Sequence, residues 1–289
     1  MQSLLATIEE RTGLRGTQFQ PLSGGMIGDV YQIDLADGRK VVAKVADSEA
    51  ASLRIEGYML RYLGEHSQLP VPDVLYDADD TLLLMTYIEG QSQLGDAEQQ
   101  HAAELLADLH NLTQPQYGLE RDTMIGPLHQ PNPPSDSWID FFRDHRLLYM
   151  ARLAHADGPL PADFLARIEK LSTRLDNWLF EPEQPSLIHG DIWTTNVLTR
   201  QGRITGFIDP AIYYAHAEIE LAYTTLFGTF GRTFNSAFFD HYHTLRPIQP
   251  GFFEERRHLY NLYPLLVHVR LFGGSYMNRV DEILHTFGF

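Results

Sequence analysis

The chain contains no cysteine among its 289 residues. This absence excludes disulfide bonds, zinc sites built from thiolates and a cysteine nucleophile. Long hydrophobic stretches are missing too, because no apolar run approaches the roughly 18–20 residues that cross a bilayer. The first residues also lack the basic start and the apolar core of a signal peptide. We therefore expect a cytoplasmic protein without a membrane partner.

Positive charge is scarce in this sequence. Lys and Arg together number 22 against 38 Asp and Glu, which leaves a net charge of −16. A field of this sign repels nucleic acid and anionic lipid, so we expect neither as a partner, whereas a cationic or neutral substrate is compatible with it. Lysine is especially rare, since the chain has only Lys40, Lys44 and Lys170. Nothing in the composition predicts an oligomeric state.

One segment, 187–210, combines carboxylates and an amide at a spacing typical of phosphoryl transfer. Asn196 follows Asp191 by five positions, and Asp209 follows it by eighteen. Phosphoryl transfer from a nucleotide needs a carboxylate that orients the attacking hydroxyl and accepts its proton. It also needs oxygen ligands that hold Mg²⁺ on the phosphates. Two aspartates and an asparagine in this order can provide both, so the spacing predicts a kinase site that uses ATP and Mg²⁺.

A single aspartate in a loop is more often a turn residue than a catalytic group. The sequence around Asp209 weakens that interpretation. Segments 197–199 and 204–208 are short and apolar, and we predict that they form strands around a turn at 200–203. Asp209 would then stand at the end of a strand, where a metal ligand is held rigidly.

A charged residue also interrupts an apolar strand predicted near the start of the chain. Lys44 lies in segment 41–45, whose other residues are apolar. It could lie on an edge strand with its amine in water, or it could pair with the α/β-phosphates of a nucleotide and with a helix carboxylate. A helix predicted over 47–64 offers Glu49 and Glu56. Glu56 is favoured because it lies well inside the helix, although either glutamate could simply be solvated.

A glycine-rich turn precedes this strand and joins two other predicted strands, 17–22 and 30–35. Glycine lets backbone N–H groups approach phosphates closely, so such a turn could cover the phosphates of a nucleotide. Its spacing is not that of the G-x-G-x-x-G motif, and an ordinary hairpin turn is the simpler interpretation. The residues of the turn considered for nucleotide binding are Ser23, Gly24, Gly25 and Gly28.

The predicted elements change character near residue 89. Residues 1–88 are mostly strands and end in an apolar run whose backbone, at Thr86 and Ile88, could bind a nucleotide base. Residues 89–289 are mostly helical, apart from an irregular loop predicted over 113–136 on account of its five prolines. We therefore divide the chain into an N-terminal nucleotide-binding lobe, 1–88, and a C-terminal helical lobe, 89–289, with a cleft between them. The predicted helices of the second lobe include 102–112, 138–154, 164–179, 219–230, 233–245, 252–272 and 277–287.

Several sequence motifs resemble those of known kinases. HGDIWTTN around Asp191 and FIDP at Asp209, together with the strand lysine and the helix glutamate, resemble the aminoglycoside phosphotransferase and choline kinase branch of the protein-kinase-like superfamily. The tryptophan of HGDIW, the segment DPAIYY and the tail LYNLYPLLVH with LFGG more narrowly resemble the fructosamine (ketosamine) kinase family. The likeness covers nearly the whole chain.

This resemblance implies an α+β, bilobal protein-kinase-like fold. A small antiparallel-sheet N-lobe with one helix would precede a larger, mostly helical C-lobe. The implied reaction is ATP- and Mg²⁺-dependent phosphorylation of a sugar hydroxyl on a ketosamine, the adduct left on a glycated amine or protein. It would be a repair reaction, because the phosphorylated adduct comes apart and frees the amine.

The resemblance also implies roles for individual residues. Asp191 would be the catalytic base, and Asn196 and Asp209 would bind Mg²⁺. Lys44 with Glu56 would hold the α/β-phosphates beneath the glycine-rich turn. The residues implied for substrate binding are Trp193, His268 and Glu218. Glu218, like the nearby Glu220, could instead brace the catalytic loop.

Two other functions fit part of the same pattern. The chain could phosphorylate another small hydroxylated acceptor, such as an aminoglycoside, a choline-like alcohol or homoserine, or it could be a nucleotide-binding scaffold without activity. Only about eight residues separate Asp209 from the next predicted helix, which leaves no room for a peptide-docking activation segment. We therefore expect a small or flexible substrate.

Overall fold

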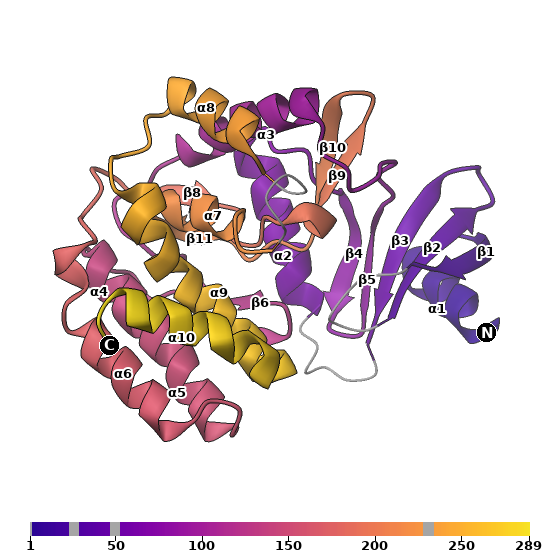
Figure 1. Ribbon diagram of the computed structural model, residues 1–289. Coiled ribbons are helices and arrows are strands. Elements are labelled where there is room, and N and C mark those ends of the chain that lie inside the picture. Colours follow the sequence, from indigo (N-terminus) through magenta and orange to yellow (C-terminus); the bar gives the residue numbers. More distant parts are fainter. Residues whose placement is uncertain (1, 23–28, 47–52, 228–233) are drawn as a thin grey trace.

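The computed structural model describes residues 2–22, 29–46, 53–227 and 234–289, and it has two parts that lie side by side (Figure 1). An antiparallel sheet with its helices forms the N-terminal part, and the C-terminal part is mostly helical. This confirms the predicted order of a β-rich part followed by a helical one. The boundary between residues 88 and 89 stays a prediction.

The N-terminal sheet has five antiparallel strands in the order β1-β2-β3-β5-β4. These strands are β1 (Gly16–Pro21), β2 (Asp29–Leu35), β3 (Lys40–Val45), β4 (Val74–Asp79) and β5 (Leu82–Thr86). The central strand is β3, which pairs with β2 on one side and with β5 on the other. Lys44 therefore lies in the middle of the sheet, and the edge-strand interpretation of this residue is wrong.

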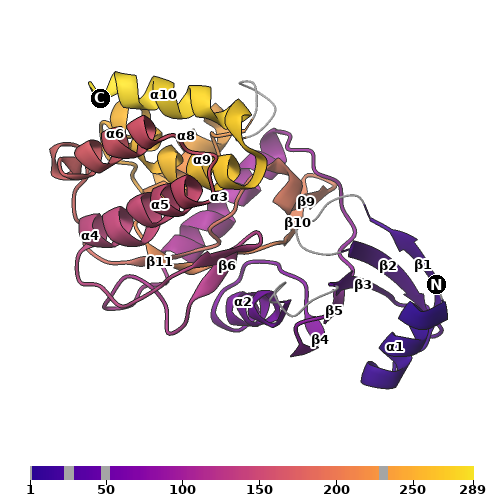
Figure 2. The same cartoon turned by 90° about the horizontal axis from the view of Figure 1, so that it is seen from below.

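Both faces of this sheet are buried, as the side chains along β5 show. Leu82 and Leu84 pack on the side of α1 (Gln2–Thr12), whereas Leu83 and Met85 pack on the side of α2 (Leu53–His66). Successive side chains of a strand point to opposite faces, so a continuous apolar run buries both. Figure 2 shows α1 and α2 on opposite sides of the sheet, with α2 next to the helical part.

The C-terminal part is built around α9 (Arg257–Phe272), in which every residue from 259 to 269 is buried. A helix buried all round must be surrounded by other elements. Those in contact with α9 include α5 (Leu148–Ala156), α7 (Glu218–Tyr223) and α10 (Met277–Thr286). The other helices of this part are α3 (Asp96–His110), α4 (Trp138–Phe142), α6 (Ala162–Ser172) and α8 (Ser236–Leu245). Short helical segments are η2 (Arg143–Leu147), η3 (Leu175–Asn177), η4 (Thr194–Asn196), η5 (Phe252–Arg256) and η6 (Gly274–Tyr276).

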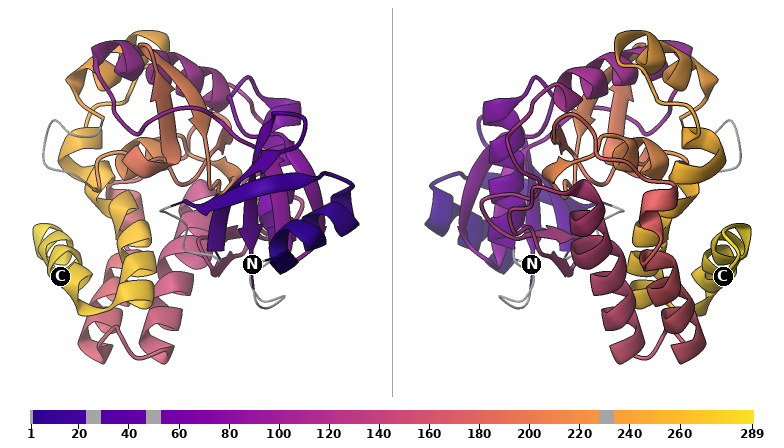
Figure 3. Two further views of the ribbon diagram at one scale, coloured as in Figure 1. Left: turned by 90° about the vertical axis from the view of Figure 1, so that its right-hand side faces the viewer. Right: turned by 90° about the vertical axis from the view of Figure 1, so that its left-hand side faces the viewer.

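The N-terminus lies at α1 on the sheet and the C-terminus lies on the helical part, so the two ends of the chain are far apart (Figures 1 and 3). Among the residues that the structure describes, no helix is long and apolar enough to cross a membrane.

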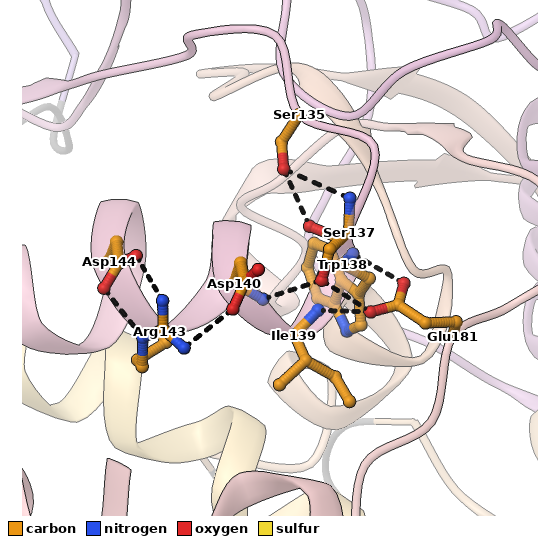
Figure 4. A network of polar contacts seen from close by, with 8 residues as sticks. All are labelled: Ser135, Ser137, Trp138, Ile139, Asp140, Arg143, Asp144 and Glu181. Atoms are coloured by element: carbon orange, nitrogen blue, oxygen red, sulfur yellow. Dashed lines mark hydrogen bonds and ion pairs between the residues drawn. The ribbon is translucent and has the colours of Figure 1, made fainter. Parts of the chain in front are cut away.

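Hydrogen bonds at the start of α4 tie distant segments together (Figure 4). Ser137 caps the helix by accepting a first-turn N–H at 3.1 Å. The carboxylate of Glu181 accepts the N–H of Trp138 at 2.6 Å. An anion at a helix N-terminus satisfies N–H groups that have no partner within the helix. The contact anchors the chain just before β8 (Ser186–Ile188), the strand that leads into the loop of Asp191.

Three predicted elements differ in the structure. Segment 113–136 contains a hairpin of β6 (Thr123–Ile125) and β7 (Leu128–Gln130), and its prolines lie outside these strands, where they do not interrupt the ladder. The helix predicted over 164–179 ends at Ser172, and only the short helix η3 continues the buried apolar face beyond it. The helix predicted over 219–230 ends at Tyr223, and residues 228–230 lie outside the described part.

The hairpin predicted between the two site segments is confirmed. It consists of β9 (Val197–Arg200) and β10 (Arg203–Phe207), which pair in an antiparallel manner. A further strand, β11 (Tyr213–Ala215), follows it and pairs with β8. The chain thus passes from β8 through a loop, the hairpin and a second loop into the partner strand of β8.

Candidate active site

The loop after β8 lies directly against the segment after β10. The N–H of Ala211 donates to the carbonyl of His189 at 2.7 Å, and the N–H of Ile208 donates to the carbonyl of Asn196 at 3.0 Å. These bonds join the two segments although a hairpin separates them in the sequence. The two carboxylates predicted for the site are thereby held near each other.

Two backbone conformations at this junction are unusual. Gly190 has a φ of +85°, and a Cβ atom there would lie 2.2 Å from the carbonyl oxygen of Ala211, an approach that only glycine permits. Asp209 has a φ of +56°, in a left-handed region that few residues other than glycine adopt. Such conformations persist only where the surroundings hold them, and they are concentrated at functional sites.

The amine of Lys44 binds two carboxylates. Its Nζ lies 2.5 Å from Oε1 of Glu56 on α2 and 2.5 Å from Oδ1 of Asp209. Burial opposes the charge on Lys44, but the two carboxylates outweigh burial and raise the pKa of the amine above its ordinary value. Lys44 thus stays charged and links the sheet to the loop of Asp209. The other predicted partner, Glu49, lies outside the described residues.

The carboxylate of Asp191 accepts two side-chain hydrogen bonds. The amide of Asn196 donates to its Oδ2 at 2.9 Å, and the hydroxyl of Tyr223 donates to the same carboxylate. Burial raises the pKa of Asp191 to about 7; the hydrogen bonds oppose this rise, and the charge of Asp209 adds to it. A carboxylate with a pKa near neutrality is suited to accept and release a proton at physiological pH.

A cleft of about 580 Å³ joins these groups and has walls from both parts of the chain. This volume is within the range of small-molecule sites. Its sheet side is largely apolar, with Val30, Val42 and Met85 around Lys44. The residues predicted for the site that line the cleft are Lys44, Glu56, Thr86, Ile88, Asp191, Trp193, Asn196, Asp209 and His268.

Glu218 is placed elsewhere, against the expectation that it binds substrate. Its carboxylate makes a buried two-point ion pair with Arg256, at 2.6 Å to Nε and 2.8 Å to Nη2, and it is not among the residues that line the cleft. The geometry of this fork-to-fork pair leaves the carboxylate fully engaged. We therefore assign Glu218 a structural role.

Glu220 braces the catalytic loop instead. Its carboxylate accepts the N–H of Gly190 at 2.6 Å and a hydrogen bond from Nε2 of His110 at 2.9 Å. Burial alone would raise the pKa of Glu220, but its hydrogen bonds, that from His110 above all, outweigh burial and hold the pKa below its ordinary value. The loop of Asp191 is thus fixed to α3 and α7.

The glycine-rich turn of Ser23, Gly24, Gly25 and Gly28 lies outside the described residues, so its contact with phosphates stays a prediction. At the position predicted for the base, the N–H of Thr86 already donates to the carbonyl of Asp73 at 2.9 Å.

The sequence comparisons identify the family of this chain. Residues 1–287 match the family described as fructosamine kinase. The chain belongs to the fructosamine kinase family. A "probable ketoamine kinase" of Synechocystis sp. is 32% identical, over 98% of this chain and 95% of that protein. A chloroplastic protein-ribulosamine 3-kinase of Arabidopsis thaliana is 31% identical, over 71% of this chain and 61% of its own.

Solved structures agree with this membership. A candidate fructosamine-3-kinase from Thermobifida fusca superposes with a TM-score of 0.88 at 30% identity, over 99% of this chain and 98% of that one. An aminoglycoside phosphotransferase, solved with ADP and hygromycin B, has a TM-score of 0.70 at 19% identity, over 99% of each chain. The second likeness concerns the fold alone, and it confirms the α+β, bilobal protein-kinase-like architecture. The chain is thus a kinase of the fructosamine kinase family, whose members use ATP.

Two cleft features of this family member were not predicted from its sequence. Tyr223 reaches Asp191 from α7, yet in the sequence nothing distinguishes it from the other aromatic residues of the helical region. Met124, Ile125 and Gly126 line the cleft from the β6–β7 hairpin, in a segment expected to be irregular. The apolar pair Met124 and Ile125 was the one available signal for a strand there.

Replacing Glu220 with glutamine is expected to lower kcat about 10- to 100-fold. The side-chain N–H₂ of glutamine would face N–H donors that now meet a carboxylate oxygen, so the loop of Asp191 would shift. A small displacement of a catalytic group can lower the reaction rate by up to about 100-fold. The KM for ATP should change by less than about threefold, because Glu220 does not line the cleft. Steady-state kinetics with varied ATP would measure both constants.

Glu218→Gln is the matched control for this variant. It also disrupts a buried glutamate of α7, but its partner Arg256 does not touch the catalytic loop. It should lower the melting temperature and leave kcat within about twofold. An equal fall of kcat in both variants would show that general destabilisation, not loop positioning, explains the effect.

Asp191→Asn is expected to stabilise the protein free of metal and nucleotide at high pH. The pKa of Asp191 rises from 3.8 to about 7 on folding, so ionising this group between those values destabilises the folded state. Removing the ionisable group should therefore raise the free energy of unfolding by about 2 kcal/mol at pH 8 and by almost nothing at pH 4. The figure at pH 8 is smaller than the full pKa shift would give, because Asp191 faces the open cleft. Urea unfolding of both proteins at the two pH values would test this. Equal stability at pH 8 would contradict the raised pKa.

Proposed function

We propose that this protein transfers the γ-phosphoryl group of ATP to a sugar hydroxyl of a ketosamine, and so starts the release of the amine from its glycation adduct. One observation supports it most: Lys44, Asp191 and Asp209 come together in a single cleft of a chain whose relatives include a protein-ribulosamine 3-kinase. These residues by themselves support a kinase and do not indicate its acceptor. Membership of the fructosamine kinase family supports a ketosamine as the acceptor.

The sheet side of the cleft would bind the nucleotide. Lys44, held by Glu56, would place its ammonium on the α/β-phosphates. The base would lie in the apolar slot that includes Val30, Val42 and Met85. Because the N–H of Thr86 is already used, we assign base recognition to its carbonyl and to the backbone of Ile88.

The other side of the cleft fits a magnesium ion held on the phosphates. Mg²⁺ is bound by hard oxygen ligands, commonly one or two carboxylates together with substrate phosphates rather than a cage of protein groups. Asp209 and Asn196 offer such oxygens, and no cluster of three or more His, Cys, Asp or Glu ligands occurs in the described part of the chain. The Lys44 contact uses Oδ1 of Asp209, so its Oδ2 can face a cation. When bound, the ion would neutralise charge on the transferring group.

Asp191 would orient the acceptor hydroxyl and accept its proton. The hydroxyl oxygen forms a bond to the γ-phosphorus while the bond from that phosphorus to the bridging oxygen of ADP breaks, and ADP leaves. The hydrogen bonds from Asn196 and Tyr223 fix the carboxylate in one orientation. Trp193 and His268 would form the wall against which the sugar lies.

A panel of glycated amines tests this function directly. The ribulosamine, fructosamine and erythrulosamine adducts of one amine would be incubated with the protein, ATP and Mg²⁺, next to an aminoglycoside, choline and homoserine. We expect a mass increase of one phosphate on at least one ketosamine and turnover on it that exceeds that on the other acceptors by about 100-fold or more, as expected where a site is built for a substrate's polar groups. Faster turnover on an aminoglycoside or on choline would replace the ketosamine assignment.

A further inference from the structure

A chain of aromatic rings leads from the cleft to the surface. It begins at Trp193, two positions after Asp191 and on the cleft wall. The ring of Phe227 lies 5.5 Å from that of Trp193 and 4.5 Å from the imidazole of His268. These centroid distances are those of favourable aromatic pairs, so the three rings form one contiguous cluster. His268 also lines the cleft, and beyond it the rings continue outward.

Phe272 and Tyr276 extend this surface past the cleft; we call the pair the outer shelf. Phe272 is one helical turn after His268 on α9, and the rings are 5.6 Å apart. The turn at Gly273 brings Tyr276 back, so that its ring lies 5.0 Å from His268 and 6.1 Å from Phe272. Neither residue of the outer shelf lines the cleft itself.

One residue of the outer shelf is exposed to solvent, whereas Tyr276 is half-buried. Phe272 is 55% exposed, which is the largest exposed fraction among the large hydrophobic side chains of the described residues. A single exposed apolar residue needs no explanation, but an exposed ring that continues an aromatic wall of a binding cleft does. Trp and Tyr-type rings with one buried edge and one open face are typical recognition surfaces.

The charges of the cleft bear on what the shelf could bind. Among the described residues, the acidic side chains that line the cleft are Glu56, Asp191 and Asp209, and all three are engaged with Lys44, Asn196 or Tyr223. The amine nitrogen of a ketosamine is a secondary amine that carries positive charge near neutral pH. Because these carboxylates already have partners, we expect the faces of the aromatic rings to attract this cation.

We propose that the outer shelf binds the amine side of the ketosamine, with the ammonium over the ring of Tyr276 and the aliphatic stem of a lysine-type carrier over the ring of Phe272. This assignment rests on the proposed function and adds a determinant of which glycated amine is accepted. The sugar would lie against Trp193 and His268, and the carrier would run outward over the two rings. The imidazole does not repel the cation, because burial lowers the pKa of His268 and keeps the ring neutral.

Two ketosamines that share one sugar and differ in the amine test the shelf. The first is the adduct of methylamine, too short to reach Phe272, and the second is the adduct of the lysine Nε in a short peptide. We expect Phe272→Ala to raise the KM for the peptide adduct about three- to tenfold, because the aliphatic stem loses its apolar contact with one ring. The KM for the methylamine adduct and kcat for both should stay within about twofold. Phe272→Leu, which keeps apolar bulk without a π face, should give an intermediate KM.

Phe253→Ala is the matched control, because Phe253 is another exposed phenylalanine, 39% exposed on η5, away from the cleft lining. It should change neither KM, and melting curves would show that both alanine variants are folded. If Phe272→Ala changes the KM of both adducts equally, or of neither, the outer shelf does not bind the amine side of the substrate. The proposed kinase activity would not be affected by that result. If the unmodified protein phosphorylates neither adduct, the proposed function fails and the shelf fails with it.

Discussion

Asp191→Asn should lower kcat by about a thousandfold or more while the Kd for Mg·ATP changes by less than about threefold. General base catalysis contributes about 10²- to 10⁴-fold, and asparagine keeps the shape of the side chain but cannot accept the proton of the hydroxyl. Binding of the nucleotide should survive, because Lys44 and Glu56 are untouched and the variant removes negative charge from the cleft. Single-turnover kinetics and a nucleotide titration would measure the two quantities separately.

Asp144→Asn provides the control for this change. It is the same substitution at an exposed aspartate of η2, paired with Arg143 and remote from the cleft lining. Its kcat should equal that of the unmodified protein. If Asp191→Asn retains more than about a tenth of the activity, a different group accepts the proton and the catalytic role of Asp191 is wrong.

Asp209→Ala should abolish the dependence of nucleotide binding on magnesium. In the unmodified protein, we expect ATP to bind about 100-fold more tightly with Mg²⁺ than without it, because Asp209 would hold the ion that neutralises the phosphates. Without the Asp209 carboxylate, the two affinities should converge on the weaker value. Calorimetric titration of ATP, with Mg²⁺ and with EDTA, would give both constants.

The Lys44 contact makes this prediction sharper. Alanine at position 209 removes one of the two carboxylates that bind Nζ, but Glu56 remains at 2.5 Å and keeps the amine in place. Binding of ATP without metal should therefore change little, since the lysine still meets the phosphates. An unchanged Mg·ATP affinity in Asp209→Ala would remove Asp209 from the metal site, whereas loss of metal-free binding as well would indicate a collapsed cleft. Circular dichroism of the variant would distinguish collapse from loss of the ligand.

The elements with strong local signals were predicted well. The hairpin of β9 and β10 was expected from two short apolar segments around a turn. The apolar run noted at the end of residues 1–88 forms β5, which is buried on both faces. The helix expected over 252–272 ends as predicted at Phe272, with η5 in its first residues and α9 in the rest. The hairpin of β6 and β7 was not predicted, because three-residue strands leave no periodic pattern and prolines on either side suggested a loop.

The candidate site also contains residues that the sequence indicates and residues that it does not. Asp191, Asn196 and Asp209 could be selected because their spacing in the sequence is itself a pattern with a chemical reason. Tyr223 could not, because nothing in an apolar helix marks the one aromatic residue whose hydroxyl reaches a carboxylate. Glu218 and Glu220, two positions apart, are equivalent in the sequence.

The sequence by itself determined the chemistry of the site: which carboxylates, which amide and which lysine are available, and the order of a β-rich part before a helical one. Only the tertiary structure decided which side chains these groups contact. It placed Lys44 on the central strand between Glu56 and Asp209, turned Glu220 to the catalytic loop and Glu218 to Arg256, and brought Tyr223 to Asp191. The physical reason is that spacing and propensity act between neighbours along the chain. The direction of a side chain, and the pKa that follows from its burial and partners, depend on segments that meet only after folding.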